Sequence, residues 1–379
     1  MKDTRDRVLA VHVIMGKESN AEISQHIAEL ISLINTDGGN VVETIVQRIR
    51  APRSSTLFGP GQIQTINEAA KRCNADVVVL NTELSPQQQR NIETMVEKRI
   101  IDRTRLIIDI FAKHAHSREG KLEVEEALLR YMLPRLTGKG IVMSQTGGGV
   151  GTRGPGETKL EMDRRKIKDR LKKIKQLMEA VRTQRLTQQS KRIKFDIPVV
   201  SLVGYTSAGK STLLNTLTKS FVKTDEELFT TLDPISRRLY FENGVYAIIT
   251  DTVGFIDRLP IQLIKAFRTT LEDVSNADLL LLVIDISKPD YENDIKIVMD
   301  VLEEISTDKK PIIYVFNKID KLDPAVSLRN LTNKYEKSIC VSAINGTGIE
   351  ALKSMILSEL TLLKHTDVSE GTYELYRVV

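Results

Sequence analysis

The stretch Gly204-Tyr205-Thr206-Ser207-Ala208-Gly209-Lys210-Ser211 fits the pattern G-x-x-x-x-G-K-[ST] and decides the fold of the C-terminal half. An apolar run at residues 199–203 predicts a strand before it, and residues 211–217 predict a helix after it. In this setting backbone N–H groups surround phosphates, Lys210 reaches the β- and γ-phosphates, and the Ser211 hydroxyl binds Mg²⁺. The nucleotide contacts expected from this loop come from Gly204, Tyr205, Thr206, Ser207, Ala208, Gly209, Lys210, Ser211 and Thr212.

A second motif, Asp251-Thr252-Val253-Gly254, follows a strand predicted at residues 245–250. Because neighbouring parallel strands bring their carboxyl ends together, we expect Asp251 beside the phosphate loop, where it holds Mg²⁺ through a water molecule. The N–H of Gly254 is expected to sense the γ-phosphate. Asp-x-x-Gly alone is more often a simple turn, so the prediction depends on its order between stronger motifs.

A third motif, Asn317-Lys318-Ile319-Asp320, follows an apolar strand predicted at residues 312–316 and matches the base-reading element of GTPases. The Asp320 carboxylate can accept two hydrogen bonds from guanine that adenine cannot donate, which predicts a preference for GTP. Ser342 and Ala343 follow a strand predicted at residues 339–341 and are expected to contact O6 of the base through a backbone amide. Together the motifs predict a binding site for GTP or GDP with Mg²⁺.

The N-terminal region alternates short β-rich runs with helical stretches, which favours a small parallel sheet. The predicted strands are residues 8–14, 41–49, 77–80 and 106–110, and the predicted helices are near residues 21–34, 62–73 and 86–98. This part shows no phosphate loop, metal-ligand spacing or nucleophile–base signature. The histidines (His12, His26, His114, His116 and His365) are scattered along the chain, and we assign them no role.

Residues 111–195 predict two helices around a glycine-rich loop. In the second helix apolar residues recur at spacings of four and three, a narrow seam suited to packing against one neighbouring helix. These seam residues are Ile167, Leu171, Ile174, Met178 and Val181. We therefore predict an antiparallel helical hairpin.

Positive charge is concentrated on that second helix. Residues 157–195 contain fourteen lysines and arginines against five acids, a surplus of nine, whereas the whole chain has a surplus of five. A solvated helix face is the simpler interpretation, but a local surplus larger than that of the chain is better explained by contact with phosphates. The residues expected to contact RNA are Arg153, Lys159, Arg164, Arg165 and Lys168.

The glycine-rich loop contains a G-x-G-x-x-G match at Gly149, Gly151 and Gly154, the pattern of a dinucleotide fold. Pro155 and Gly156 interrupt the helix that such a fold needs, and no strand ending in an acid follows, so we reject that interpretation. A flexible surface loop remains one alternative. The alternative that we favour is a loop in which Arg153 and the backbone amides, unshielded by side chains at the glycines, approach an RNA backbone.

The four GTPase motifs, with other segments, resemble the HflX family of ribosome-associated GTPases. Those segments are Glu83-Leu84-Ser85-Pro86, Arg118-Glu119-Gly120-Lys121-Leu122, Gly151 to Glu161, and Phe229-Thr230-Thr231-Leu232-Asp233-Pro234. The resemblance implies that Thr231 closes on Mg²⁺, so that Ser211, Thr231 and Asp251 serve the metal and Lys210, Thr231 and Gly254 serve catalysis. It also implies binding to the large ribosomal subunit and its rRNA, and splitting or rescue of stalled ribosomes. The alternatives are a GTP-switched RNA-binding scaffold, a ribosome-assembly factor, or a tRNA-modification GTPase.

We predict an α/β chain in four parts. These are an N-terminal α/β domain (1–110), a helical hairpin with the glycine-rich loop (111–195), a P-loop GTPase domain (196–364) and a short tail (365–379). Phe255 stands where Ras-like GTPases place the glutamine that orients water, which predicts hydrolysis that is slow alone and stimulated by the ribosome. Two cysteines and no apolar run longer than residues 279–284 predict a cytoplasmic protein without membrane insertion.

Overall fold

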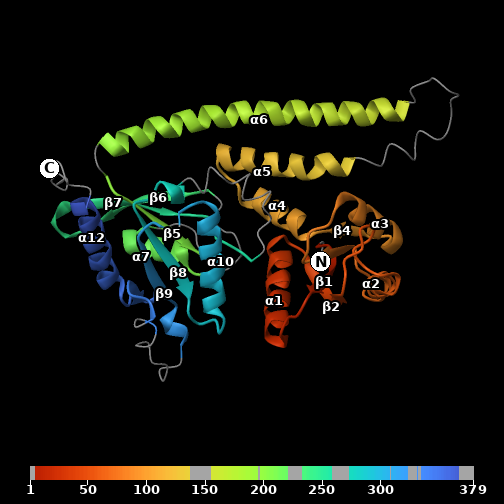
Figure 1. The fold of residues 1–379 in the computed structure, drawn as a ribbon, viewed down its shortest axis with the longest axis horizontal. Coiled ribbons are helices and arrows are strands. Elements are labelled where there is room, and N and C mark those ends of the chain that lie inside the picture. The colour runs from red at the N-terminus through yellow and green to blue at the C-terminus, as the bar shows by residue number, and fades with distance from the viewer. Residues whose placement is uncertain are drawn as a thin grey trace. The chain divides into compact units, whose positions relative to one another are not determined.

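The computed structural model describes residues 5–136, 155–194, 197–220, 233–257, 273–307, 309–322, 331 and 334–366. The chain forms two compact units, the first built mainly from residues 1–181 and the second mainly from residues 182–379 (Figure 1). Both units contain a sheet with parallel strands and packed helices, which confirms the predicted α/β class.

The first unit contains a four-stranded parallel sheet with the order β2-β1-β3-β4. Its strands are β1 (Arg7–Met15), β2 (Asn40–Ile49), β3 (Val77–Leu80) and β4 (Arg99–Ile101), and its helices are α1 (Asn20–Thr36), α2 (Pro60–Arg72), α3 (Pro86–Val96) and α4 (Arg103–His114). Side chains alternate along β1, so that Leu9, Val11 and Val13 pack into one core with α2 and α3. Helices α1 and α4 pack on the other side of the sheet.

The prediction of a strand at residues 106–110 is wrong. These residues lie in α4, and the fourth strand is β4. The Asp102 carboxylate caps α4 by accepting from the N–H of Arg105 at 2.9 Å, and α4 is buried on several sides because it packs on α1, α5 and β3. A short, wholly apolar run in such a helix has the same sequence pattern as a buried strand. Helix α4 also continues through residue 110. The domain boundary that the sequence analysis expects at this residue remains a prediction.

A helical hairpin follows in the first unit. Helices α5 (Arg118–Met132) and α6 (Pro155–Lys194) lie side by side and run in opposite directions (Figure 1). The guanidinium of Arg170 donates to both carboxylate oxygens of Glu125 at 2.6 Å, and Ile174 in the predicted seam is fully buried. The predicted antiparallel hairpin is therefore confirmed.

The second unit is built on a six-stranded sheet with the order β10-β9-β8-β5-β7-β6, in which only β6 pairs in antiparallel fashion. The strands are β5 (Val199–Gly204), β6 (Ile235–Tyr240), β7 (Tyr246–Asp251), β8 (Leu279–Asp285), β9 (Ile312–Asn317) and β10 (Ser338–Cys340), with helices α7 (Lys210–Thr218), α10 (Tyr291–Glu304) and α12 (Ile349–Thr366). Strand β8 is buried at every position. Since β5, β7, β8 and β9 are parallel and adjacent, the motifs that follow them meet at one edge of the sheet.

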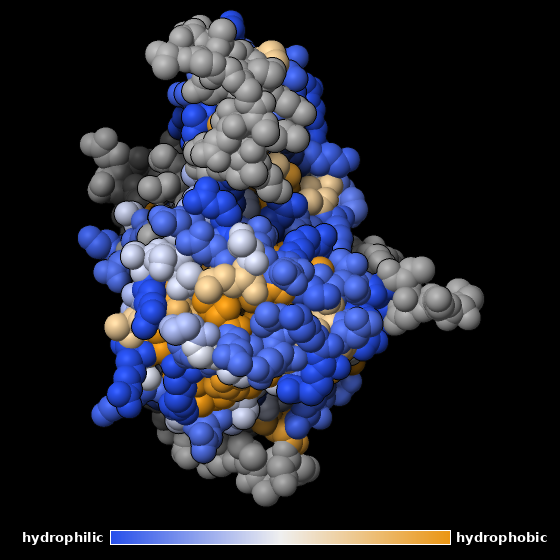
Figure 2. Space-filling model, turned by 90° about the vertical axis from the view of Figure 1, so that its right-hand side faces the viewer, coloured by the Kyte–Doolittle hydropathy of each residue, from blue (hydrophilic) through white to orange (hydrophobic). Residues whose placement is uncertain are grey.

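The surface of the first unit on the side of α2 and α3 is mainly hydrophilic, with smaller apolar areas between (Figure 2). Among the residues that the structure describes, no helix combines the length and the hydropathy needed to cross a membrane.

Candidate functional site

The loop between β5 and α7 has the compact shape that a phosphate cradle requires. Its last residue, Gly209, has a φ of +93°, and a Cβ atom there would lie 2.4 Å from Nδ2 of Asn317. Glycine fits this position, because the left-handed backbone disfavours a side chain and the close approach of Asn317 leaves no room for a Cβ. The loop therefore leads directly into the N-terminus of α7, where an anion is favoured.

Lys210 occupies the centre of this loop. Its side chain is buried, and Nζ donates to the carbonyl oxygens of Gly204 and Tyr205 at 3.0 Å each. Burial lowers the pKa of Lys210 to about 8, although the nearby Asp251 carboxylate opposes this shift. Gly254 lies against the same ammonium group, since a Cβ on it would be 3.1 Å from Nζ. A phosphate entering the loop would meet both residues.

Ser211 and Asp251 lie side by side at the mouth of the loop. The Ser211 hydroxyl donates to Oδ2 of Asp251 at 2.6 Å, and Asp251 is fully buried at the end of β7. Hydroxyl and carboxylate oxygens are the donors that Mg²⁺ prefers, and the ion usually takes few protein ligands beside the phosphates. This pair of oxygens fits a Mg²⁺ ion bound together with a nucleotide.

The chain after Gly254 is attached to the phosphate loop. The N–H of Thr206 donates to the Phe255 carbonyl at 2.7 Å, and the N–H of Phe255 donates to the Gly204 carbonyl at 3.1 Å. The N–H of Asp257 donates to the Tyr205 hydroxyl at 3.0 Å. The Phe255 side chain is only 2% exposed, so it is packed inside and offers no polar group to a water molecule.

The base-reading motif is joined to the phosphate loop through two side chains. Nδ2 of Asn317 donates to the Ala208 carbonyl at 2.9 Å. Nζ of Lys318 donates to the Ser207 carbonyl and to Oδ2 of Asp285, each at 2.7 Å. Although burial opposes it, hydrogen bonds from Lys318 and Ser287 hold the pKa of Asp285 below its usual value. Asp285 is a member of this site that the sequence analysis missed, and its position at the end of β8 was the available signal.

Asp320 and the Ser342–Ala343 turn come together, as expected for a base pocket. The Ser342 hydroxyl donates to Oδ1 of Asp320 at 2.5 Å, which orients the carboxylate. The N–H of Ala343 donates to Oδ1 of Asn317 at 3.0 Å, so the amide predicted to contact O6 already has an acceptor. A bound guanine would have to share or replace that acceptor.

The structure thus brings together most of the predicted nucleotide residues. In the second unit these are Gly204 to Thr212, Asp251, Gly254, Asn317, Lys318, Asp320, Ser342 and Ala343. Arg164, Arg165 and Lys168 lie on α6 in the first unit. Thr231 and Arg153 lie outside the described residues, as do the glycine-rich loop up to Gly154 and the side chain of Lys159.

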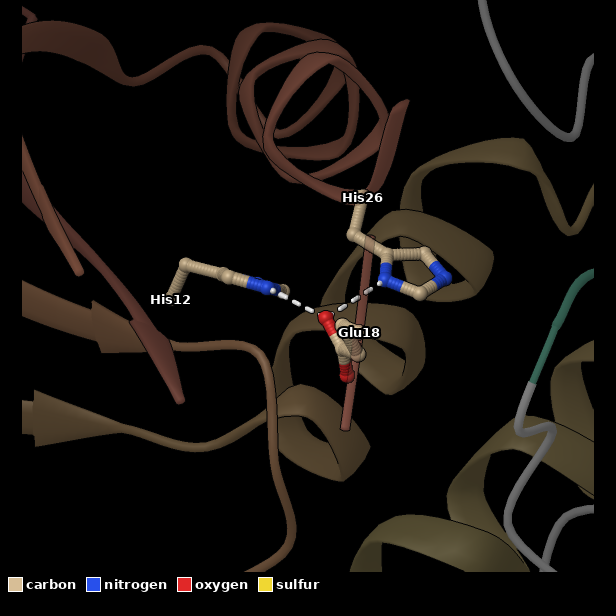
Figure 3. A group of neighbouring side chains, drawn as sticks. All are labelled: His12, Glu18 and His26. Atoms are coloured by element: carbon tan, nitrogen blue, oxygen red, sulfur yellow. Dashed lines mark hydrogen bonds and ion pairs between the residues drawn. The ribbon is translucent and has the colours of Figure 1, made fainter. Parts of the chain in front are cut away.

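Two of the histidines to which the sequence analysis assigned no role come close together in the fold. His12 on β1 and His26 on α1 both approach Glu18 (Figure 3). Oε2 of Glu18 lies 3.1 Å from Nε2 of His12 and 3.3 Å from Nδ1 of His26. Two histidines and a glutamate form a ligand set that zinc sites use.

Asn81 argues against a metal at this cluster. Its Oδ1 accepts from the N–H of Val13 at 2.7 Å, so its amide NH₂ must face Nδ1 of His12, 2.6 Å away. Nδ1 therefore accepts a hydrogen bond, and neutral His12 carries its proton on Nε2, where it donates to Glu18. A protonated Nε2 has no lone pair for a metal ion. We therefore interpret the cluster as a hydrogen-bonded clamp between β1 and the start of α1.

Comparison with known proteins identifies the family. Three family models match successive parts of the chain, described as GTP-binding GTPase N-terminal (residues 24–112), GTP-binding GTPase Middle Region (114–192) and 50S ribosome-binding GTPase (199–318). The protein GTPase HflX of Alkalihalophilus pseudofirmus is 44% identical over 94% of this chain and 84% of its own length. That of Escherichia coli is 40% identical over 96% of this chain and 85% of its own length.

The chain belongs to the HflX family of GTPases. Membership makes it an enzyme that binds guanine nucleotides and hydrolyses GTP to GDP and phosphate. A solved structure described as the SsGBP and GDP complex is also similar to this chain, with 25% identity and a TM-score of 0.50. It covers 94% of this chain and 99% of that one.

Proposed function

We propose that this HflX-family GTPase binds the large ribosomal subunit through rRNA and uses GTP to split or rescue stalled ribosomes in the cytoplasm. The observation that carries the proposal is the basic surface of α6. Its exposed side chains include Arg165, Lys166, Lys168, Lys172, Lys173, Lys175 and Arg182. The family model described as 50S ribosome-binding GTPase, which matches residues 199–318, supports the same partner.

The position of these charges on α6 favours contact with a polyanion. The seam residues of α6, among them the buried Ile174, face α5. The lysines and arginines therefore occupy the remaining surface of this helix, which has few other apolar side chains. Phosphate contacts release counterions and therefore give sequence-independent, salt-dependent affinity. A ribosomal RNA surface is a partner of this kind.

In the second unit we propose roles for the assembled residues. Lys210 and the Gly254 amide bind the β- and γ-phosphates, and Asp320 with the Ser342–Ala343 turn selects guanine. Ser211, Asp251 and Thr231 would hold Mg²⁺, which would neutralise charge on the phosphate oxygens.

Phe255 bears on the rate of GTP hydrolysis by the free protein. Its side chain is buried and apolar, so this position cannot orient the attacking water. We infer that hydrolysis is slow in the free protein and that the ribosome supplies or orders the missing polar group. Single-turnover hydrolysis with and without purified large subunits tests this inference, and equal rates would contradict it.

Binding to the ribosome is tested with charge-reversed α6. The variant Arg164→Glu, Arg165→Glu, Lys168→Glu is expected to lose co-sedimentation with large subunits and to show a weaker salt dependence, with unchanged GTP affinity. The control Lys17→Glu, Lys71→Glu, Lys121→Glu reverses three exposed charges elsewhere in the first unit. Equal loss in both variants, or intact binding of the α6 variant, would count against α6 as the docking element. Binding to protein-free RNA but not to intact subunits would favour an RNA-binding scaffold instead.

A further inference from the structure

The end of β2 and the loop after it present three arginines in a stretch of sequence without acids. Arg48, Arg50 and Arg53 are all exposed, and no Asp or Glu occurs between Thr44 and Asn67. Other arginines of this unit are neutralised by ion pairs, such as Arg72 with Glu43, Arg99 with Asp6, Arg105 with Asp109 and Arg130 with Glu126. Within the part of the chain that the structure describes, the three arginines form no such pair.

This arginine loop (Arg48, Arg50 and Arg53, within residues 48–58) is held in one conformation. The backbone groups of Arg53 and Leu57 exchange hydrogen bonds of 3.1 and 2.9 Å, and the side chain of Leu57 is only 4% exposed. Helix α3 fixes the loop from the side: Nε2 of Gln88 donates to the Arg53 carbonyl at 2.9 Å, and Nδ2 of Asn91 donates to the Ser55 carbonyl at 2.8 Å. Because the loop is ordered before any partner binds, less conformational entropy is lost on binding.

The spacing of the side chains suits a chain of phosphates. Arg48 lies in β2 and Arg50 directly follows the strand, so two residues of extended chain separate their Cα atoms by about 7 Å. Arg53 follows, and the exposed Ser54 and Ser55 add hydroxyl donors. Guanidinium groups bind phosphate oxygens through two parallel hydrogen bonds, and serine hydroxyls also contact phosphates.

We propose that the arginine loop is a second RNA-contact surface, which binds the sugar–phosphate backbone of RNA and does not read its bases. The proposal deepens the proposed function, because it rests on rRNA as the partner, and it adds a contact independent of α6. Base reading is not expected here. The aromatic side chain of the loop, Phe58, is fully buried, and the amides of Gln88 and Asn91 are engaged with the loop backbone.

An anionic membrane surface is a poorer match. Membrane-surface binding normally combines basic residues with exposed apolar side chains that enter the interface. In the arginine loop the large apolar residues Leu57 and Phe58 are buried, and the exposed residues between the arginines are Ala51 and Pro52. The loop therefore offers charge without an apolar anchor.

The test uses the full chain with two matched double variants. Arg50→Ala with Arg53→Ala removes two charges that form no ion pair with another described residue, and Arg72→Ala with Arg99→Ala removes two exposed but acid-paired charges from the same unit. The probe is protein-free large-subunit rRNA, titrated at several KCl concentrations. For the loop variant we expect affinity to fall about tenfold or more near 0.1 M salt. The slope of log affinity against log salt should become shallower by about 1.4, because each phosphate that an arginine neutralises contributes about 0.7 to it.

The outcomes separate this proposal from the proposed function. Equal losses in both double variants, or unchanged RNA affinity in the loop variant, would overturn the arginine loop as an RNA contact. Loss of binding to phosphatidylserine vesicles with RNA binding intact would overturn it in favour of a membrane. The wild-type chain could bind free rRNA through Arg50 and Arg53 without binding intact subunits. That result would contradict the proposed function and support the arginine loop as an RNA contact. Circular dichroism and GTP affinity, both expected to be unchanged, control for folding.

Discussion

Nδ2 of Asn317 donates to the carbonyl oxygen of Ala208 at 2.9 Å and thereby joins the base-reading motif to the phosphate loop. The other side of the same amide accepts from the N–H of Ala343 at 3.0 Å. One buried side chain thus connects β9, the loop after β5 and the turn after β10. The three parts of the site therefore depend on each other for their position.

Asn317→Ala is expected to weaken GTP and GDP binding by a similar factor of at least ten. It leaves a buried carbonyl and a buried N–H unpaired, each at a cost of about 1–3 kcal/mol, so the second unit should also lose stability. Titration with a fluorescent guanine nucleotide and urea unfolding measure the two effects. Asn293→Ala on α10 is the control, and an unchanged affinity for Asn317→Ala would show that this connection does not hold the site together.

Asp320→Asn is expected to shift base preference from guanine to xanthine. The carboxylate accepts two hydrogen bonds from guanine, whereas an amide at this position can donate to the extra carbonyl of xanthine. Competition of GTP and xanthosine triphosphate for the same fluorescent nucleotide measures the shift, with GTP affinity expected to fall about 100-fold or more. Glu304→Gln on α10 controls for loss of an acid. An unchanged GTP affinity in the Asp320 variant would show that the base binds elsewhere.

Nucleotide affinity is expected to fall above a pH of about 8. Burial lowers the pKa of Lys210 from 10.5 to about 8, whereas a triphosphate favours its charged form, so binding above this pH requires uptake of a proton. Affinity should be constant below pH 8 and fall by up to tenfold for each further pH unit. Calorimetry in buffers with different ionisation enthalpies counts the protons taken up.

Lys210→Arg separates this effect from general alkaline damage. A guanidinium stays charged throughout the range, so the residual affinity of that variant should not depend on pH, and an identical fall would exclude Lys210 as the cause. Stability of the nucleotide-free protein should change in the opposite direction. Since the unfolded chain keeps the lysine proton up to about pH 10.5, the free energy of unfolding rises between pH 8 and 10.5.

Phe255→Gln is expected to leave the intrinsic hydrolysis rate within about threefold of the wild-type rate. The backbone at this position is bonded to Gly204 and Thr206, and the side chain is buried, so a new amide would not face the phosphates. It would instead bury an unsatisfied polar group and destabilise the unit by about 1–3 kcal/mol. Single-turnover rates and urea unfolding test both statements, and a large acceleration would mean that the side chain can reach the attacking water.

Asp102→Ala is expected to destabilise the first unit by about 3–5 kcal/mol. The fully buried carboxylate accepts from the N–H groups of Leu84 and Arg105 and from the Tyr131 hydroxyl, and it forms an ion pair with Arg135 at 3.1 Å. Its removal leaves Arg135, which is largely buried, without its carboxylate partner. Tyr131→Phe removes one hydrogen bond and should cost about 1 kcal/mol. Urea unfolding of the full chain compares the two, and equal small effects would contradict a central role for Asp102.

The motifs of the second unit could be predicted because each one is local. Gly204 to Ser211, Asp251 to Gly254 and Asn317 to Asp320 each follow an apolar run, and parallel strands bring their carboxyl ends together whatever the rest of the chain does. The contacts of Asp285 and Phe255 needed the structure. Their hydrogen bonds join them to segments that follow other strands, which no local pattern specifies.

In the first unit the sequence was less informative. Residues 106–110 have an apolar pattern that fits a buried strand and a buried helix equally, and packing between α1, α5 and the sheet decided for the helix. The clamp of His12, Glu18 and His26 is invisible in the sequence, because Asn81, which fixes the His12 tautomer, lies 69 positions away.

The sequence by itself therefore determined the α/β class, the nucleotide chemistry and the basic character of α6, since periodicity, motif spacing and charge are properties of neighbouring residues. Tertiary structure alone decided which arginines form ion pairs with described acids, which carboxylate faces which lysine, and which histidine nitrogen carries the proton. Those properties depend on the distances between side chains that are far apart in the chain and on their burial, and both are set only when the chain folds.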